Sequence, residues 1–521
     1  MRRVPGTGAR GVRRRCPILA QVTPRDTAPD RPTPTELAGL LAGGSRIGVS
    51  TSATKVEGRA HEGGRTESVW DAFARRPGAV ADGSDPERGA RHMERYREDV
   101  ALATELGVDV LSFSLSWSRI QPEARGGLRR EGIAFYDELV DALLAAGIRP
   151  RAALHDHDLP VELQDRGGWL HRDTALRFGD LAYLAAEALA DRVPDWVTLR
   201  TPALTTMGGH VTGTHAPGSR LGLDALPTVH HQLLAHGLAV EAIRGSRSAA
   251  RVGIVNAHRI VEAASADDDD RAAALVARAL HQDLFADAVL LGRYPDLTGP
   301  HAEAFERLGR VDPADLRVIG QPLDHYGVAL ADPIRVAAVP RLVAGSTAIP
   351  FTELPWADHP SSLDGHPVAP DLVPAVLADL RARYGDALPP VVLSGLDAAH
   401  PEQVDDRDGS RRDPRRAHSI SDHLVQALAA VAPGGQAEGV RIEAVVAGSL
   451  LDGFEWEAGR AAPRGLVHVD PRTGDRTPRS SYRFLRDTLR ERADTAAGRR
   501  PQNGCAGPAY PGSSPGPRVG S

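Results

Sequence analysis

The chain has 521 residues, of which 41% are hydrophobic, and its formal net charge at pH 7 is −6. This composition is typical of a soluble globular protein with a large buried core, and the mild acidic excess gives no indication of a nucleic-acid partner. No stretch of about 18 apolar residues indicates a membrane span, so we expect no membrane association.

The two ends of the chain differ from its middle. Residues 1–44 are rich in Arg, Pro, Gly and Thr, residues 494–521 are rich in Gly, Pro and Ser, and we expect both to be disordered. Cys16 and Cys505 lie in these ends, so neither a disulfide framework nor a cysteine-ligated metal site is expected, which is compatible with a cytoplasmic protein. The N-terminus has the basic residues of an export signal, but its apolar run is too short for a signal core.

Residues 45–493 alternate short apolar runs, typical of strands, with longer stretches of helical periodicity. The expected strands are eight, at residues 46–52, 108–117, 149–155, 196–201, 251–258, 325–330, 390–395 and 444–451. Helical patterns follow the first two strands and end at Gly107 and Gly147, where a left-handed cap is expected. The alternation predicts an α/β fold, a single-domain (β/α)₈ TIM barrel with its site on the loops after the strands.

A doubly wound open sheet is the alternative fold. The turn after its first strand would carry a Gly-rich phosphate-binding fingerprint, and residues 50–58, STSATKVEG, have none. Further along, the four aspartates at 267–270 indicate an acidic helix start rather than a calcium loop. His230, His231 and His236 lie along a predicted helix, where solvated or core roles are expected.

Eight segments follow one another in a characteristic order over about residues 45–490. They are VEG from Val56, ESVWDAF from Glu67, SFSLSWSRIQP from Ser112, DLPVELQDRGGWLHRDT from Asp158, HAPG from His215, IGQPLD from Ile319, SLLDGFEWEAG from Ser449 and RGLVHVDPRTGDRTPRSSYRF from Arg464. Together they resemble the family 1 β-glycosidases. Within them Trp70, Phe113 and Trp117 are expected in the core or at the rim of the barrel.

The resemblance implies a retaining glycosidase with two catalytic Glu residues about 5 to 5.5 Å apart, at the ends of strands four and seven. Where the family has Thr-Leu-Asn-Glu-Pro, residues 198–202 read TLRTP, so Thr201 stands at the acid/base position. Where the family has Thr-Glu-Asn-Gly, residues 394–397 read SGLD, so Gly395 stands at the nucleophile position. A Thr hydroxyl cannot act as a general acid at neutral pH and Gly has no side chain, so no catalytic residue of the family kind is expected.

Other family positions differ as well. Ser112 replaces an Arg, Lys55 a Gln, Asp156 and His157 a His and a Trp, Ala329, Leu330 and Ala331 an Asn and two Tyr, and Gly448 a Trp. The loss of the Arg suits the loss of its carboxylate partner, because an unpaired buried charge costs about 3 to 5 kcal/mol. Glu455 and Trp456 retain the family residues and are candidates for sugar contact, or for packing within their loop.

Lys55 is the only lysine of the chain and is expected in the mouth of the barrel. There it could form a Schiff base, or simply a salt bridge with Glu57 or Asp156. Asp156, His157 and Asp158 form a short cluster that suggests an acid/base pair or a metal site. Adjacent ligands point poorly toward one centre and Asp158 matches a structural family position, so no metal is expected.

Arg200, at the end of the fourth strand, is expected to point toward the old sugar site. With Lys55 and His157 it would make the pocket cationic enough for a carboxylate or phosphate, unless Asp156 and Asp397 neutralise it.

These patterns leave three functions open. The first is a non-hydrolytic family 1-like barrel that binds a small-molecule ligand, a sugar or an anionic metabolite, without a cofactor. The second is an enzyme with other chemistry at the same pocket, and the third is residual β-glucosidase activity. The sequence indicates no oligomeric state.

Overall fold

The computed structural model describes residues 32–498, apart from residues 60, 61, 63, 124, 247–248, 298–304, 306–307, 309 and 341–346. In this part of the chain eight parallel strands close into a barrel in the order β1, β2, β3, β4, β5, β7, β10, β13. Their bounds are β1 Arg46–Ser50, β2 Val110–Ser114, β3 Arg149–His155, β4 Asp195–Arg200, β5 Arg251–His258, β7 His325–Leu330, β10 Val391–Ser394 and β13 Ile442–Ser449. Each corresponds to a predicted strand, which confirms the (β/α)₈ barrel.

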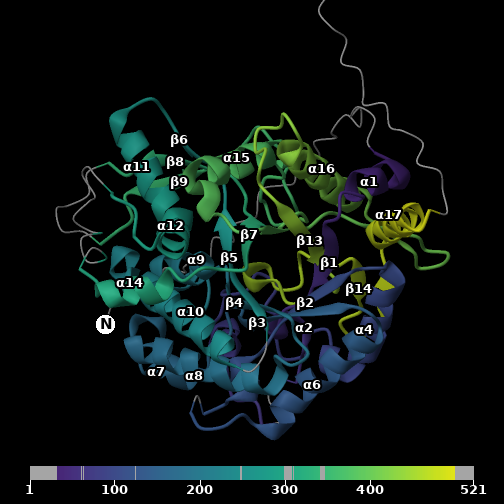
Figure 1. Cartoon of the computed structure of the whole chain (residues 1–521), viewed down its shortest axis with the longest axis horizontal. Coiled ribbons are helices and arrows are strands. Elements are labelled where there is room, and N and C mark those ends of the chain that lie inside the picture. The colour runs from purple at the N-terminus through teal and green to yellow at the C-terminus, as the bar shows by residue number, and fades with distance from the viewer. Residues whose placement is uncertain are drawn as a thin grey trace, which may run out of the picture.

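Long helices surround the barrel as an outer ring (Figure 1), and several short helices directly follow strand ends. They are α1 Pro34–Leu41, α2 Ala53–Val56, α3 Val69–Ala74, α4 His92–Leu106, α5 Trp117–Ile120, α6 Arg130–Ala145, α7 Val161–Asp165, α8 Arg172–Leu189, α9 Pro202–Leu204, α10 Pro227–Gly245, α11 Asp268–Arg278, α12 Leu284–Leu291, α14 Pro313–Ile319, α15 Val373–Tyr384, α16 Pro414–Val431 and α17 Ser480–Ala496. The predicted left-handed glycine of α4 is present, since Gly107 has φ = 84°. Helix α11 starts with three aspartates in its first turn, where the positive end of the helix dipole stabilises negative charges, as predicted.

The N-terminal helix α1 corrects one expectation. Residues 34–41, expected to be disordered, form a helix with a capping box of Thr33 and Glu36, and it packs against α17 through buried Leu37 and Leu41. Helix α17 likewise continues past residue 493 to Ala496. The remaining residues of both predicted disordered ends, with Cys16 and Cys505, lie outside the described residues.

The main hydrophobic core lies between the barrel and the helices. Trp70, Phe113 and Trp117 are at most 2% exposed, as predicted, and His236 is buried on α10, where its Nδ1 lies 2.6 Å from Thr198 Oγ1. A second, small cluster of Val392, Ala444 and Val446 is separate from this core. All three lie on β10 and β13.

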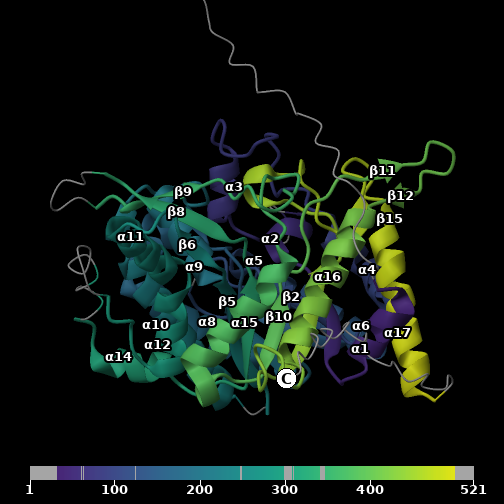
Figure 2. The same cartoon turned by 90° about the horizontal axis from the view of Figure 1, so that it is seen from above.

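Short sheets follow some of the barrel strands. They are β6 Val261–Ala263 with β8 Ile334–Ala338 and β9 Phe351–Leu354, β11 Gln403–Val404 with β12 Arg411–Arg412, and β14 Val467–Val469 with β15 Arg476–Pro478. In Figure 2 β8, β9, β11 and β12 lie on the same side of the molecule as α2 and α3, which follow β1. These insertions therefore build up the face at which the parallel strands end.

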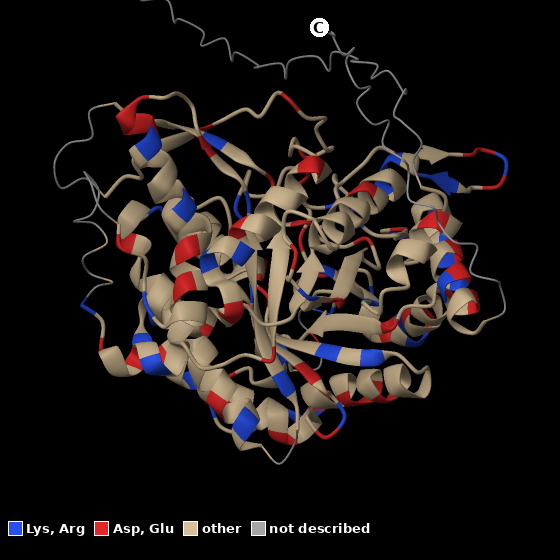
Figure 3. Ribbon diagram, turned by 45° about the horizontal axis from the view of Figure 1, so that its top comes forward, with Lys and Arg blue, Asp and Glu red and all other residues tan. Residues whose placement is uncertain are grey.

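Ion pairs join strands at the opposite end of the barrel. Asp195, which begins β4, pairs with Arg149 and with Arg251 (3.2 Å), and Arg251 also pairs with Glu443 on β13 (2.8 Å). On the outer helices acidic and basic residues are intermixed (Figure 3). Among the described helices none has the length and apolar character needed to cross a membrane.

Candidate functional site

A cavity of about 780 Å³ opens at the C-terminal ends of the barrel strands. The sequence-predicted residues that line it are Lys55, Ser112, Asp156, His157, Arg200, Thr201, Ala329, Gly395, Asp397, Gly448, Glu455 and Trp456. The structure therefore brings together residues that are up to 400 positions apart in the sequence. The other two changed family positions, Leu330 and Ala331, line a neighbouring cavity.

Thr201 occupies the first position after β4 and has φ = 43°, a left-handed conformation that is unfavourable for a β-branched residue. Its amide donates to Val255 O on β5 (2.7 Å), and its Oγ1 lies 3.1 Å from His157 Nε2. The hydroxyl of Thr205, one helical turn further, lies 2.8 Å from His157 Nδ1. The imidazole thus has an oxygen partner at each nitrogen.

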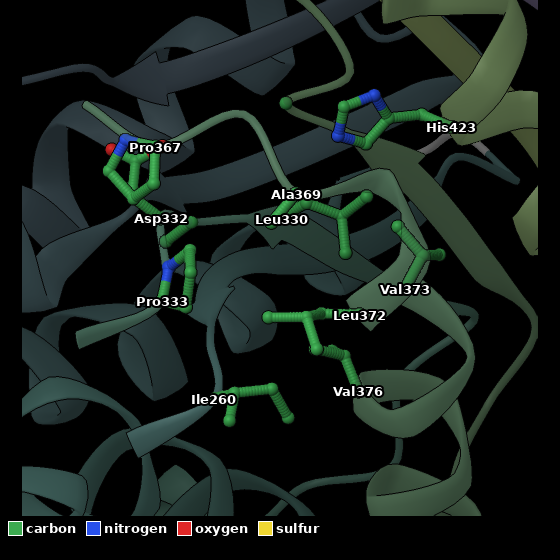
Figure 4. Close-up of a pocket in the computed structure, with 12 residues that line it drawn as sticks. Ile260, Leu330, Asp332, Pro333, Pro367, Ala369, Leu372, Val373, Val376 and His423 are labelled. Carbon is green, nitrogen blue, oxygen red and sulfur yellow. The ribbon is translucent and has the colours of Figure 1, made fainter. Parts of the chain in front are cut away.

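Gly395 occupies the first position after β10 and has φ = 80°. A Cβ at this position would lie 2.4 Å from Leu330 O and 3.0 Å from Leu330 N, both backbone atoms of β7. Behind this contact lies a cavity of only about 40 Å³, between Leu330, Leu372, Val376 and His423 (Figure 4). The backbone around Gly395 therefore leaves no room for a side chain.

Lys55 is paired with a different carboxylate from those expected. Its Nζ lies 2.6 Å from Glu455 Oε2 and 4.9 Å from the ring centre of Trp456. Glu57, one expected partner, is instead buried with Arg119 (3.0 Å) and accepts from the Tyr136 hydroxyl (2.5 Å). Lys55 thus links α2, which follows β1, to the segment after β13.

Arg200 is held by three groups at the bottom of the cavity. Its guanidinium donates to Asp156 Oδ2 (3.0 Å), Thr51 O (3.0 Å) and Ser112 Oγ (2.7 Å). Although burial opposes ionisation, Arg200 and the neighbouring cations hold the pKa of Asp156 below its ordinary value. Of the alternatives for Asp156, the pair with Arg200 is the one that forms.

The cluster of residues 156–158 spreads in different directions. Asp158 accepts hydrogen bonds from Ser116 (2.5 Å) and Ser118 (3.4 Å), whereas Asp156 pairs with Arg200. These contacts agree with the expectation that Asp158 occupies a structural position. Within the described ranges no group of three or more His, Cys, Asp or Glu side chains is placed to hold a metal ion.

His157 does not add positive charge to the cavity, contrary to one of the expectations. Burial lowers its pKa from 6.5 to about 3, and the nearby Asp156 offsets only part of this shift. The imidazole is therefore neutral at pH 7, and Arg200 and Lys55 are each paired with a carboxylate. The expected cationic mouth is not formed, because the described lining holds six carboxylates against five Lys and Arg side chains.

The lowered pKa of His157 predicts that the folded protein becomes less stable as the pH falls. Between pH 6.5 and about 3 the unfolded chain binds a proton at this residue and the folded chain does not, so its stabilising contribution is complete above pH 6.5 and falls with acidification. We expect His157→Gln to reduce the slope of unfolding free energy against pH by up to about 1.4 kcal/mol per pH unit over this interval. Urea unfolding at pH 5, 6 and 7 measures the slope. His366→Gln is the control, because Asp332 raises the pKa of His366 and its loss should not reduce the slope; equal reductions in both variants would contradict the prediction.

Most of the chain matches a known protein family. The family model of glycosyl hydrolase family 1 matches residues 44–493. The chain belongs to glycosyl hydrolase family 1. It is 34% identical to a β-glucosidase of Agrobacterium sp. over 87% of this chain and 95% of that protein, and 32% identical to β-glucosidase A of Acetivibrio thermocellus over 85% and 96%.

Solved family 1 structures superpose over most of the chain. The virulence factor SghA of Agrobacterium tumefaciens has a TM-score of 0.81 and 32% identity, covering 88% of this chain and 99% of its own. The family 1 β-glucosidase of Thermotoga maritima has a TM-score of 0.79 and 30% identity, covering 86% and 98%. SghA has been solved with the substrate analog salicin, and the Thermotoga enzyme with glucoimidazole.

Sequence reasoning missed several residues of this family 1 pocket. Arg464 pairs with Asp364, and its Nε lies 4.0 Å from Glu455 Oε2. His215 pairs with Glu457 (2.9 Å), inside the HAPG and FEWEAG segments that carried the resemblance. Another missed residue, Arg151, had a signal: an arginine within the apolar strand RPRAALH.

Proposed function

We propose that this family 1 barrel binds a small polar ligand in its cavity and does not hydrolyse glycosides by the retaining mechanism of the family. The observation that carries the proposal is the pair of positions after β4 and β10, which hold Thr201 and Gly395 while the cavity remains open at about 780 Å³. Neither residue has a carboxyl group, so neither the acid/base nor the nucleophilic step has its usual group.

The remaining carboxylates of the cavity support this proposal, because most are committed to cations. Asp332 pairs with His366 (3.0 Å), and Asp156, Asp364 and Glu455 pair with the Arg and Lys residues described above. Glu457 pairs with the imidazole of His215. Although burial opposes ionisation, Arg200 and Arg464 lower the pKa values of Asp156 and Asp364, and the hydrogen bond with His215 lowers the pKa of Glu457. A general acid at neutral pH needs the opposite shift.

Backbone strain also points to a retained binding role. Among the described residues five non-glycine side chains have positive φ, and three of them, His157, Thr201 and Trp456, line the cavity. Such conformations cost about 1 to 3 kcal/mol each and gather at functional sites. Trp456 stacks on buried Trp70 with ring centres 4.5 Å apart, next to Lys55 and Glu455. These groups offer an aromatic face and hydrogen-bonding groups for a hydroxylated ring.

Tryptophan fluorescence tests ligand binding directly. We expect methyl β-glucoside or a sugar acid to change the emission saturably without product formation, and Trp456→Leu to remove most of this change because its ring lies at the cavity. Trp356→Leu is the matched control, since Trp356 does not line this cavity. Product formation by the purified protein, or an unchanged response in Trp456→Leu, would contradict the proposal.

A further inference from the structure

Arg151 is a buried arginine for which the described residues provide no ion-pair partner. It lies in the middle of β3, its residue is only 4% exposed, and it lines the cavity. Its Nε and Nη2 atoms are buried and have no hydrogen-bond partner. In the described part of the chain it forms no ion pair, although buried arginines are normally paired. Burial lowers its pKa to about 10, so the guanidinium remains charged at neutral pH.

The carboxylates that interact electrostatically with Arg151 are already taken. Asp195 and Glu443, at the base of the barrel, are paired with Arg149 and Arg251. On the cavity side Arg200 also acts on Arg151, and its carboxylate is Asp156. Four arginines therefore face three carboxylates in this interior network, and the cavity floor lacks one negative charge.

We propose that Arg151, with Arg200 beside it, binds the carboxylate of a monocarboxylate ligand at the floor of the cavity. This inference rests on the proposed function and names the chemical class of its ligand. A guanidinium offers two parallel N–H donors that match the two oxygens of a carboxylate. One negative charge would neutralise the network, whereas a phosphate dianion would leave an excess. Val392 and Val446 line the same cavity and are apolar, which suits the hydrocarbon attached to a carboxylate.

Thermal unfolding in acetate, phosphate and glucose, at constant ionic strength, tests the proposal on the full chain. We expect acetate to raise the Tm saturably, and more than phosphate does. Arg151→Met should weaken acetate binding at least about tenfold, because it removes charge-assisted hydrogen bonds. Without acetate this variant should be no less stable than the wild type, because it replaces an unpaired buried charge with an apolar chain.

Arg130→Gln is the control, because Arg130 starts α6, is exposed and does not line the cavity, so its loss should leave the acetate response unchanged. An acetate response that is equal in the wild type and Arg151→Met would overturn the proposal, and so would stronger stabilisation by phosphate. A glucose response without an acetate response would overturn the carboxylate site and leave the proposed function standing. Turnover of a glycoside would overturn the proposed function and not the carboxylate site.

Discussion

Purified protein is expected to hydrolyse nitrophenyl β-glucosides at least about 10⁴-fold more slowly than an active family 1 enzyme, so that nitrophenol release is not measurable. Loss of a general acid alone lowers rates by about 10² to 10⁴, and removal of a whole catalytic unit by about 10⁶. The second case applies here, since Thr201 and Gly395 stand at the positions that the resemblance assigns to the acid/base and the nucleophile. A continuous absorbance assay at pH 5 to 8 measures the rate.

The β-glucosidase of Agrobacterium sp., assayed at the same concentration, is the positive control. Asp397 is the informative residue if activity does appear. No ion pair of its side chain is found in the described residues. Its carboxyl group lies close to Gly448, since a Cβ added at Gly448 would lie 2.9 Å from Asp397 Cγ. Turnover that Asp397→Asn abolishes would show that another carboxylate has taken over the chemistry, and would contradict the non-hydrolytic proposal.

Gly395→Glu is expected to destabilise the protein by about 2 to 6 kcal/mol. A non-glycine residue at positive φ costs about 1 to 3 kcal/mol, and forcing a side chain into a filled space costs about 1 to 3 kcal/mol more. The second cost follows from the Leu330 carbonyl, 2.4 Å from the added Cβ. The double variant with Gly395→Glu and Thr201→Glu should not give family-like hydrolysis, because supporting positions such as Ser112 and Asp156 also differ. Urea unfolding and the glucoside assay give the two readouts.

Gly147→Glu separates the two costs. Gly147 has φ = 73° after α6, and an added Cβ there meets nothing within 4 Å. Its substitution should therefore show only the conformational cost, about 1 to 3 kcal/mol. Equal destabilisation of the two variants would mean that the strand end at Gly395 adapts to a side chain, and that the backbone contact with Leu330 is not the obstacle.

The barrel could be predicted from the sequence because its signals are local. All eight strands, and the helix ends at Gly107 and Gly147, follow from apolar periodicity and from glycine at a left-handed position. Helix α1 was missed although its start carries a local signal, the capping box of Thr33 and Glu36. With eight residues it is too short for a clear apolar periodicity, and it packs against α17, at the other end of the chain.

The membership of the site was predictable, but its pairings were not. Motif positions correctly placed Lys55, Arg200 and Trp456 around one cavity. The choice of Glu455 rather than Glu57 as the partner of Lys55 depends on how the loops after β1 and β13 approach each other. No sequence pattern carries that information. The neutral state of His157 likewise depends on burial, which a list of neighbouring residues does not provide.

The tight contact of Gly395 with β7 has a consequence for divergence within the family. A single substitution that returned the nucleophilic carboxylate would give a less stable protein that still lacked a proton donor, because Thr201 would be unchanged. The first step back would therefore bring a cost without any gain in activity. Under the proposed function, the contact at Leu330 O would therefore oppose a return to glycoside cleavage through single substitutions.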